Sequence, residues 1–231
     1  MIGFIDSGIG GVYVLKKCIE KCPNNKFVYL ADNKNLPFGN KPQKVLQKIA
    51  EENTQKLIDM GCETVVFACN TLTAAAIKKC RKLFPKTIFI GIEPAIMLAL
   101  KDKEKALVLL TEATYKFSRL IRKNKKNKNL LFYPQKNLAS DIENGKIKSL
   151  DSYFKKENVQ GVVLGCTHYN FIKNEIEKYL GKVNFYEASE GVARRLYQFA
   201  QNSERKNITF IFTGQNEKEK YLKVLQEKKA R

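Results

Sequence analysis

The sequence predicts an α/β protein in which helices cover parallel β-sheets, and three observations lead to this prediction. Short β-rich runs alternate with amphipathic helical stretches along the whole chain, which is the pattern of parallel strands joined by helices. With 231 residues, of which 44% are hydrophobic, the chain is long enough for two domains with a sizeable core. A strand followed by a cysteine and a helix also occurs twice, once in each half of the chain.

The predicted strands are short runs with β-forming composition. In chain order they are Ile2–Ile5, Phe27–Ala31, Thr64–Ala68, Thr87–Ile90, Ala106–Leu110, Asn129–Tyr133, Gly161–Gly165, Lys182–Tyr186 and Ile208–Phe212. The helices are predicted where apolar residues recur at helical spacing. In chain order they are Gly11–Cys22, Lys41–Met60, Leu72–Phe84, Thr114–Lys123, Tyr169–Leu180, Gly191–Gln201 and Glu217–Lys229. Residues just after each strand matter most for function, because open parallel sheets bind ligands beyond the carboxyl ends of their strands.

Composition indicates a soluble protein that stays in the cytoplasm. No apolar run approaches the roughly 20 residues needed to cross a bilayer. The sequence starts with Met1-Ile2-Gly3, without the basic and apolar regions of a secretion signal. The cysteines are too few and too scattered for a disulfide scaffold, so we expect free thiols that are available for chemistry. They are Cys18, Cys22, Cys62, Cys69, Cys80 and Cys166.

The formal net charge of +19 raises a different class of function, a non-catalytic basic protein that binds nucleic acid. Of the 42 basic residues 35 are lysines, and they spread along the whole chain beside abundant asparagine. The densest run, Lys116–Lys128, has few aromatic residues for base stacking. We therefore interpret the charge as a solvated surface and do not expect nucleic acid as the main partner. A salt-sensitive shift of DNA would support the alternative.

The internal repeat predicts two thiols in a shared cleft. Thr64–Thr71 reads Thr-Val-Val-Phe-Ala-Cys-Asn-Thr, and Gly161–His168 reads Gly-Val-Val-Leu-Gly-Cys-Thr-His. Cys69 and Cys166 each follow a buried strand at the start of a helix, where the helix dipole favours a thiolate and lowers the pKa of the thiol. Two similar halves that face each other would present one acid/base group each. For the other four cysteines we prefer the interpretation that they are small apolar core residues.

Two further features stand next to predicted strand ends. Asp6–Gly11 is rich in glycine, which permits close approach of a ligand, and it leads into a helix whose N–H groups could bind an anion. The segment matches neither the dinucleotide fingerprint nor the phosphate loop, so a tight turn is the alternative interpretation. His168, the only histidine, lies two residues from Cys166, where an imidazole can relay a proton. No ligand set for a metal is found, since no partners complete the i, i+4 pair Cys18 and Cys22.

Five motifs stand in a fixed order along the chain. They are Phe4–Gly11, Tyr29–Asp32 with Leu36–Gly39, Ala68–Thr71, Gly91–Ala95 and Gly165–Tyr169. In sequence and order they resemble the motifs of the glutamate racemase family, within the aspartate/glutamate racemase superfamily, and the resemblance covers nearly the whole chain. Weaker matches are Leu110-Thr111 with Thr114 and Ser118, Ile142-Glu143, and Phe212–Gly214.

The resemblance implies two flavodoxin-like α/β lobes with parallel sheets, related by a pseudo-two-fold axis, with the active site in the cleft between them. We expect residues 1–93 plus 186–231 to form the lobe that carries Cys69. Residues 94–185 would form the lobe that carries Cys166. The boundary between residues 93 and 94 also fits Pro94, because a residue before proline is disfavoured in a helix.

The resemblance also implies an isomerase that interconverts L- and D-glutamate without pyridoxal phosphate or a metal, and that supplies D-glutamate for peptidoglycan. Cys69 and Cys166 would be the two opposed acid/base groups, with Asp6 as partner of the first thiol and His168 as partner of the second. The residues that match the family's substrate-binding positions are Asp6, Ser7, Phe38, Gly39, Asn70, Thr71, Thr114, Glu143, Thr167 and His168. An amino acid is the expected partner, a homodimer is left open, and no membrane partner is expected.

Departures from the family pattern concern substrate preference. Phe38 stands where the family usually has tyrosine, Asn170 replaces the usual proline, and Lys116–Leu138 matches poorly. No single residue fixes the length of the substrate's side chain. Aspartate or a related amino acid is therefore the alternative substrate within the same superfamily.

Overall fold

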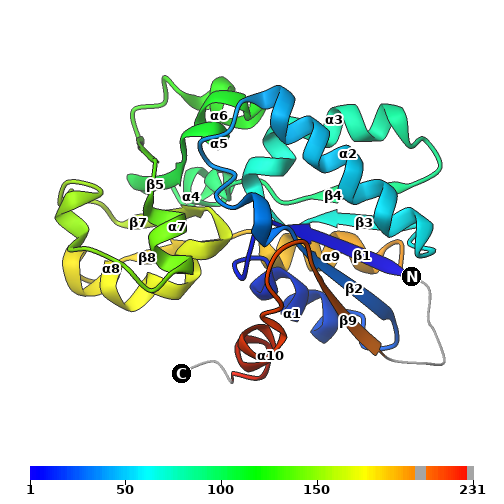
Figure 1. Cartoon of the computed structure of the whole chain (residues 1–231). Helices are drawn as coiled ribbons and strands as arrows, with labels where there is room; N and C mark the ends of the chain where they lie inside the picture. The colour runs from blue at the N-terminus through cyan, green and yellow to red at the C-terminus, as the bar shows by residue number, and fades with distance from the viewer. Residues whose placement is uncertain (201–206, 228–231) are drawn as a thin grey trace.

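The computed structural model describes residues 1–200 and 207–227, and it contains two parallel β-sheets with helices packed against them (Figure 1). This confirms the predicted α/β fold class. Each predicted strand forms within two residues of its expected ends. Among the described residues, no helix is both long enough and apolar enough to cross a membrane.

The first sheet has the strand order β4-β3-β1-β2-β9, and all its neighbouring strands are parallel. Its strands are β1 (Ile2–Asp6), β2 (Lys26–Ala31), β3 (Thr64–Phe67), β4 (Ile88–Gly91) and β9 (Asn207–Phe212). The second sheet has the order β6-β5-β7-β8 and is also parallel. Its strands are β5 (Ala106–Thr111), β6 (Leu130–Gln135), β7 (Gly161–Gly165) and β8 (Asn184–Tyr186).

The chain enters the second sheet after β4 and returns to the first sheet with β9. Tyr186, which the proposed lobe boundary assigns to the first lobe, ends β8 and pairs with Val163 of β7. The lobe boundaries at residues 93/94 and 185/186 stay a proposal, and residues 201–206 and 228–231 of the first lobe lie outside the described residues.

Helices connect the strands and cover the sheets. They are α1 (Val12–Lys21), α2 (Gln43–Asp59), α3 (Asn70–Leu83), α4 (Ile96–Lys101), α5 (Glu112–Phe117), α6 (Arg119–Asn124), α7 (Leu138–Glu143), α8 (Lys173–Leu180), α9 (Ser189–Tyr197) and α10 (Lys218–Gln226). Short 3-10 helices occur at η1 (Asn33–Asn35), η2 (Leu150–Ser152) and η3 (Thr167–Ile172). The short helices α4 and α7 were not predicted, because each is too brief to show helical periodicity.

Four predicted helices differ from those observed. The helix expected over Thr114–Lys123 is divided into α5 and α6, because Ser118 has an extended backbone and its Oγ accepts a hydrogen bond from Ile121 N, which caps α6. The helix expected over Tyr169–Leu180 begins as the 3-10 helix η3 and is α-helical only from Lys173. The helices expected to run to Gln201 and to Lys229 end earlier, at Tyr197 and at Gln226, while Gln201, Lys228 and Lys229 themselves lie outside the described residues.

The apolar core lies on both faces of each sheet. In the first sheet, Phe4 and Tyr29 pack with α1, α9 and α10, whereas Ile5 and Leu30 on the opposite face pack with α2 and α3. Figure 1 shows these two sets of helices on opposite sides of the first sheet. Strands buried on both faces have nearly continuous apolar sequences, as parallel strands generally do. The first polar residues after these strands therefore fall at the carboxyl ends of the sheets.

Candidate active site

A narrow cleft between the carboxyl ends of the two sheets brings both candidate cysteines together. Its walls come from the turns after β1, β2 and β3 of the first sheet and after β5, β6 and β7 of the second. It is lined by Ser7, Leu36, Pro37, Phe38, Gly39, Cys69, Thr71, Thr111, Lys136, Ala139, Ser140, Cys166 and His168. One thiol thus reaches the cleft from each sheet.

Asp6 ends β1 and is fully buried behind the cleft. Its Oδ1 accepts a hydrogen bond from Gly8 N at 2.8 Å, and Thr167 Oγ1 donates to Oδ2 at 3.5 Å. Burial disfavours the charged carboxylate and raises its pKa to about 7, although the nearby His168 acts in the opposite direction. Asp6 can therefore change its protonation state near neutral pH.

The glycines after Asp6 allow the two halves of the molecule to approach each other. A Cβ on Gly8 would collide with Glu143 Oε2, and a Cβ on Gly10 would lie 2.6 Å from His168 Nδ1 and 2.7 Å from Thr167 Oγ1. The sequence predicted that a ligand would approach this turn closely. At Gly8 and Gly10, residues from the second half of the chain make that close approach instead.

Cys69 follows β3 and caps the N-terminus of α3. Burial raises the pKa of its thiol well above the ordinary value, and the charges of Asp6 and Cys166 act in the same direction. Backbone N–H groups of Leu72 and Thr71 oppose this rise. The predicted lowering by the helix terminus is therefore wrong in its net direction, because removal of the sulfur from water outweighs the helix contribution.

Cys166 follows β7 and precedes the 3-10 helix η3, so no α-helix begins at this thiol. Its Sγ lies 3.8 Å from His168 Nδ1. The other ring nitrogen of His168, Nε2, lies 2.7 Å from Glu143 Oε2. Burial opposes the charged imidazolium, but hydrogen bonds to Cys166 and Glu143 raise the pKa of His168 well above its ordinary value.

Glu143 joins this pair from the end of α7. Burial opposes its ionised form, yet hydrogen bonds from His168, from Ile9 N at 2.9 Å and from Lys220 lower its pKa to about 2. Glu143 is therefore an ionised carboxylate that bonds the β1–α1 turn of the first sheet and the imidazole of the second. It fixes the orientation of His168 toward Cys166.

Hydroxyl groups form a second link across the cleft. Thr71 Oγ1 lies 2.8 Å from Thr111 Oγ1 and 3.3 Å from Thr114 Oγ1, and Thr111 donates to Thr114 at 2.9 Å. Beside them, both polar atoms of the buried Asn70 side chain lack a hydrogen-bond partner among the described residues. Buried amides are nearly always hydrogen bonded, so Asn70 is well suited to bind a polar ligand.

Comparison with known proteins shows the family to which this chain belongs. No protein-family model matches the chain. A curated glutamate racemase from Clostridium novyi is 38% identical over 195 residues, covering 78% of this chain and 75% of the relative. One from Clostridium botulinum is 32% identical over 243 residues, covering 96% of this chain and 94% of the relative. The chain belongs to the glutamate racemase family.

Solved glutamate racemases have the same fold. The structure from Francisella tularensis in complex with D-glutamate superposes with a TM-score of 0.81 at 27% identity, covering 98% of this chain and 94% of that chain. An aspartate racemase from Picrophilus torridus superposes with a TM-score of 0.52 at 17% identity and shows the fold alone. This chain is thus an isomerase with the two-lobed α/β architecture of glutamate racemases.

The structure of this glutamate racemase family member gathers the predicted site residues in two layers. Those that line the cleft are Ser7, Phe38, Gly39, Cys69, Thr71, Cys166 and His168. Those outside the lining are Asp6, Asn70, Thr114, Glu143 and Thr167. Four of these residues are buried, and the side chain of the fifth, Glu143, is only 6% exposed. The second group contacts or flanks the first group.

Some lining residues were not assigned to the site from the sequence. Thr111 was seen only as a weak family match, and it is the hydroxyl that bonds Thr71 and Thr114. Lys136 and Ser140 lie in or beside the segment that matches the family poorly, so no motif marked them. Among the residues that the structure describes, Lys136 is the only lysine or arginine that lines the cleft.

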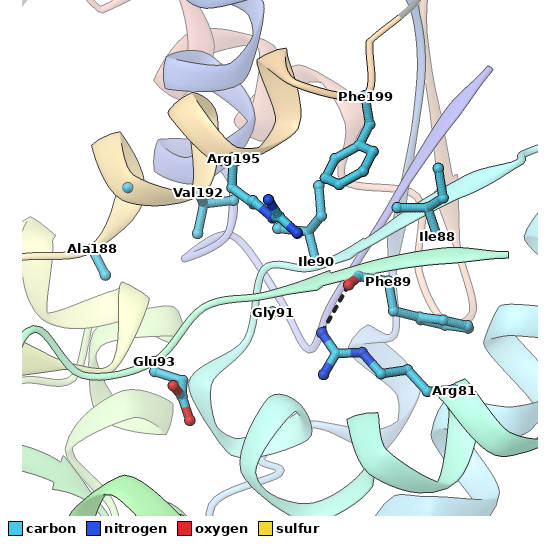
Figure 2. A pocket seen from close by; sticks show the side chains of 11 residues that line it. Arg81, Ile88, Phe89, Ile90, Gly91, Glu93, Ala188, Val192, Arg195 and Phe199 are labelled. Atoms are coloured by element: carbon cyan, nitrogen blue, oxygen red, sulfur yellow. Dashed lines mark hydrogen bonds between the residues drawn. The ribbon is translucent and has the colours of Figure 1, made fainter.

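A larger pocket lies elsewhere, between the edge strand β4 and helix α9 (Figure 2). It is lined by residues that include Arg81, Glu93 and Arg195, and Arg81 Nη2 donates to Phe89 O at 2.9 Å. Among the described residues, no cysteine or histidine lines this pocket. Cys69, Cys166 and His168 all line the smaller cleft, which is therefore the candidate active site. Within residues 1–200 and 207–227, no cluster of side chains is arranged to hold a metal.

Proposed function

We propose that this chain interconverts L- and D-glutamate, with Cys69 and Cys166 exchanging protons with opposite faces of the substrate's Cα. The observation that carries the proposal is the arrival of one thiol from each sheet in a single cleft. Racemisation requires removal of the weakly acidic Cα proton and its return on the other face. Two opposed bases do this without turning the substrate.

In one direction, a thiolate removes the Cα proton while the opposite thiol donates one; in the other direction the roles reverse. Asp6 assists at Cys69, and His168 assists at Cys166, in keeping with their hydrogen bonds and charges. Negative charge that develops on the substrate's carboxylate is met by the polar groups of Ser7 and Asn70 and by backbone N–H groups of the strand-end turns.

An acidic amino acid suits the cleft. Lys136 provides a cation for a side-chain carboxylate, and the unpartnered amide of Asn70 provides a further donor. Glutamate is preferred over aspartate because the curated relatives are named glutamate racemases and the Francisella tularensis structure was solved with D-glutamate. Supply of D-glutamate for peptidoglycan is the proposed cellular role.

The experiment that tests the two-thiol mechanism is racemisation in heavy water. Purified protein, dialysed to remove any pyridoxal phosphate, is incubated with each enantiomer of glutamate and of aspartate, and circular dichroism follows the conversion. A proton from the second thiol has exchanged with solvent, so the first product should carry deuterium at Cα. Substrate recovered early should stay largely unlabelled.

Three outcomes would contradict the proposal. Early product that retains the substrate's protium would indicate a single base that serves both faces. Loss of all activity on removal of pyridoxal phosphate would contradict a cofactor-independent reaction. Faster conversion of aspartate than of glutamate would replace the proposed substrate by the alternative one.

A further inference from the structure

Lys220, on α10, makes an ion pair with a residue that belongs to the other half of the molecule. Helix α10 follows β9 of the first sheet, whereas Glu143 ends α7, which packs against η3 beside the second sheet. Lys220 Nζ donates to Glu143 Oε1 at 2.9 Å and to the main-chain oxygen of Glu143 at 3.1 Å. It also donates to Glu217 Oε1 at 3.3 Å, so all three of its N–H groups have acceptors.

This ion pair is the outer end of a continuous series of polar contacts that leads to the cleft. Glu143 uses Oε1 for Lys220 and Oε2 for His168 Nε2, at 2.7 Å. The opposite ring nitrogen of His168 lies 3.8 Å from Cys166 Sγ. Lys220, Glu143, His168 and Cys166 are therefore joined in sequence, and Lys220 is the only member with a side chain that is substantially exposed, at 40%.

Lys220 supports the buried carboxylate of Glu143 on the side away from His168, in addition to the hydrogen bonds from His168 and Ile9 N. The side chain of Glu143 is only 6% exposed, and a buried carboxylate is costly unless it is paired and hydrogen bonded. Lys220 is the only lysine or arginine that forms a salt bridge with Glu143 among the described residues. Among the described residues, no lysine or arginine forms a salt bridge with Asp6, the carboxyl group that neighbours Cys69.

We propose that Lys220 is a positioning residue for Cys166, because its bonds to the side chain and the main chain of Glu143 hold that residue in place, and Glu143 in turn holds His168 with Nδ1 directed at the thiol. The inference rests on the proposed function in that Cys166 is one of the two acid/base groups. Lys220 touches neither the substrate nor the reacting atoms. Its effect is expected on the proton transfer at Cys166 and not on the transfer at Cys69.

The test compares Lys220→Met with Lys220→Arg and with a control, Lys218→Met. Lys218 lies on the same helix and is exposed, and its side chain has no ion pair within the part of the chain that the structure describes. Its replacement removes the same charge from α10. We expect Lys220→Met to lower kcat/KM by about 10- to 100-fold, as loss of an outer hydrogen-bonding partner does at metal centres. Lys220→Arg should retain activity within a few-fold, and Lys218→Met should match the wild type.

The kinetic readout that separates positioning from general loosening is the isotope effect of Cα-deuterated substrate. Enantiomers have equal free energies, so kcat/KM must fall equally in both directions. If the Cys166 step has become slower, the substrate isotope effect should rise for the enantiomer that Cys166 deprotonates and fall for the other enantiomer. A uniform fall in kcat/KM with unchanged isotope effects would overturn the inference, as would wild-type kinetics in Lys220→Met.

A second measurement is independent of turnover. Because His168 is the only histidine in the chain, every imidazole N–H signal in NMR of ¹⁵N-histidine-labelled protein comes from this residue, and the proton on Nε2 is the one that faces Glu143. In the wild type this proton should exchange slowly with water, since it is bonded to Glu143. Lys220→Met should speed its exchange about tenfold or more, in line with a loosened partner, and Lys218→Met should not.

The two measurements separate the inference from the proposed function. A wild-type protein that fails to racemise glutamate overturns the proposed function, while the exchange rate still tests the link from Lys220 to His168. Unchanged exchange in Lys220→Met overturns that link even if the wild type is fully active.

Discussion

Cys69 and Cys166 occupy equivalent places in two similar strand-end turns, yet the groups around them differ in charge. Cys69 begins a long α-helix and has the carboxyl group of Asp6 as its neighbour. Cys166 begins a 3-10 helix and has the imidazole of His168, supported by Glu143. The repeat thus places two similar thiols, but Asp6 from a distant strand gives one an acidic neighbour, whereas the adjacent His168, bonded to the distant Glu143, gives the other a cationic neighbour.

This difference suits a reaction in which one thiol must be protonated while the other is a thiolate. An imidazolium favours an adjacent thiolate, whereas burial beside a carboxyl group favours the neutral thiol. The direction of the pKa of Cys69, well above its ordinary value, agrees with the second case. Substitutions at the two sites therefore test whether the two thiols are equally necessary despite their unequal surroundings.

The largest expected effect comes from removing either sulfur. Cys69→Ala and Cys166→Ala should each lower racemisation by about 10²- to 10⁴-fold in both directions, because one acid/base group is lost and general acid/base catalysis contributes that much for each group. Both side chains are small and buried, so the far-ultraviolet circular dichroism signal should remain. Cys80→Ala, a buried cysteine remote from the cleft lining, is the matched control.

Near-wild-type racemisation by either of the two cleft variants would show that one thiol suffices. One cysteine would then be the catalytic thiol, and the other would be an apolar core residue.

The same comparison shows what the sequence could predict. The positions of both thiols follow from local patterns, since a β-rich run and the helix after it place a residue at a strand end. The positions of the strands and of most helices along the chain followed from the same kind of signal. What depends on segments far apart did not: Glu143 and Lys220 are 77 residues apart, and no local spacing indicates their ion pair.

The sequence also could not predict how deeply the site residues are buried. A helix start was visible after Cys69, but the removal of its sulfur from water, which raises its pKa, was not. Similarly, the glycine-rich turn after Asp6 was interpreted as a place for ligand approach, whereas Gly8 and Gly10 are in contact with Glu143, Thr167 and His168. Thr111 lines the cleft but was not predicted as a site residue, because its weak match to the family gave it no role.

The two carboxyl groups behind the thiols should give opposite dependences of stability on pH. The pKa of Asp6 is about 7 in the folded protein, above its ordinary value of 3.8, because burial disfavours the charge. The protonated form is then favoured by folding, so the wild type should lose stability as pH rises from about 4 to about 7. Asp6→Asn, which retains an acceptor for Gly8 N, should lack this loss, which is up to about 4 kcal/mol.

Glu143→Gln provides the opposite case. The pKa of Glu143 is lowered from 4.5 to about 2, so its ionised form stabilises the fold above pH 4.5, and this contribution is lost as pH falls toward 2. Thermal unfolding of both variants and the wild type between pH 3 and 8 measures the two slopes. Parallel curves for Asp6→Asn and the wild type across this range would show that Asp6 is already ionised when folded, and the contrast between the two thiol environments would disappear.

The smallest expected effect lies in the wall of the cleft on the Cys69 side. Phe38 lines the cleft, is only 2% exposed, and belongs to the same apolar cluster as Cys69 and Leu46. Phe38→Tyr restores the hydroxyl that is usual in the family, and at the cleft wall that hydroxyl can reach polar groups. We expect KM to change by no more than about fivefold and kcat to stay similar, since a single exposed or hydrogen-bonded hydroxyl contributes only about 1 kcal/mol.

The matched control for Phe38→Tyr is Phe67→Tyr, which adds a hydroxyl within the same cluster but away from the cleft lining. Phe67 is fully buried on β3, two residues before Cys69, so its new hydroxyl has no access to the cleft and should lower the free energy of unfolding by about 1 to 3 kcal/mol. Denaturant unfolding and steady-state kinetics of both variants separate the two effects. If Phe38→Tyr instead abolishes turnover while its unfolding curve matches the wild type, the cleft has been shaped around phenylalanine. The pocket next to Cys69 would then differ from that of the relatives, and glutamate would lose its place as the preferred substrate to a shorter or less polar amino acid.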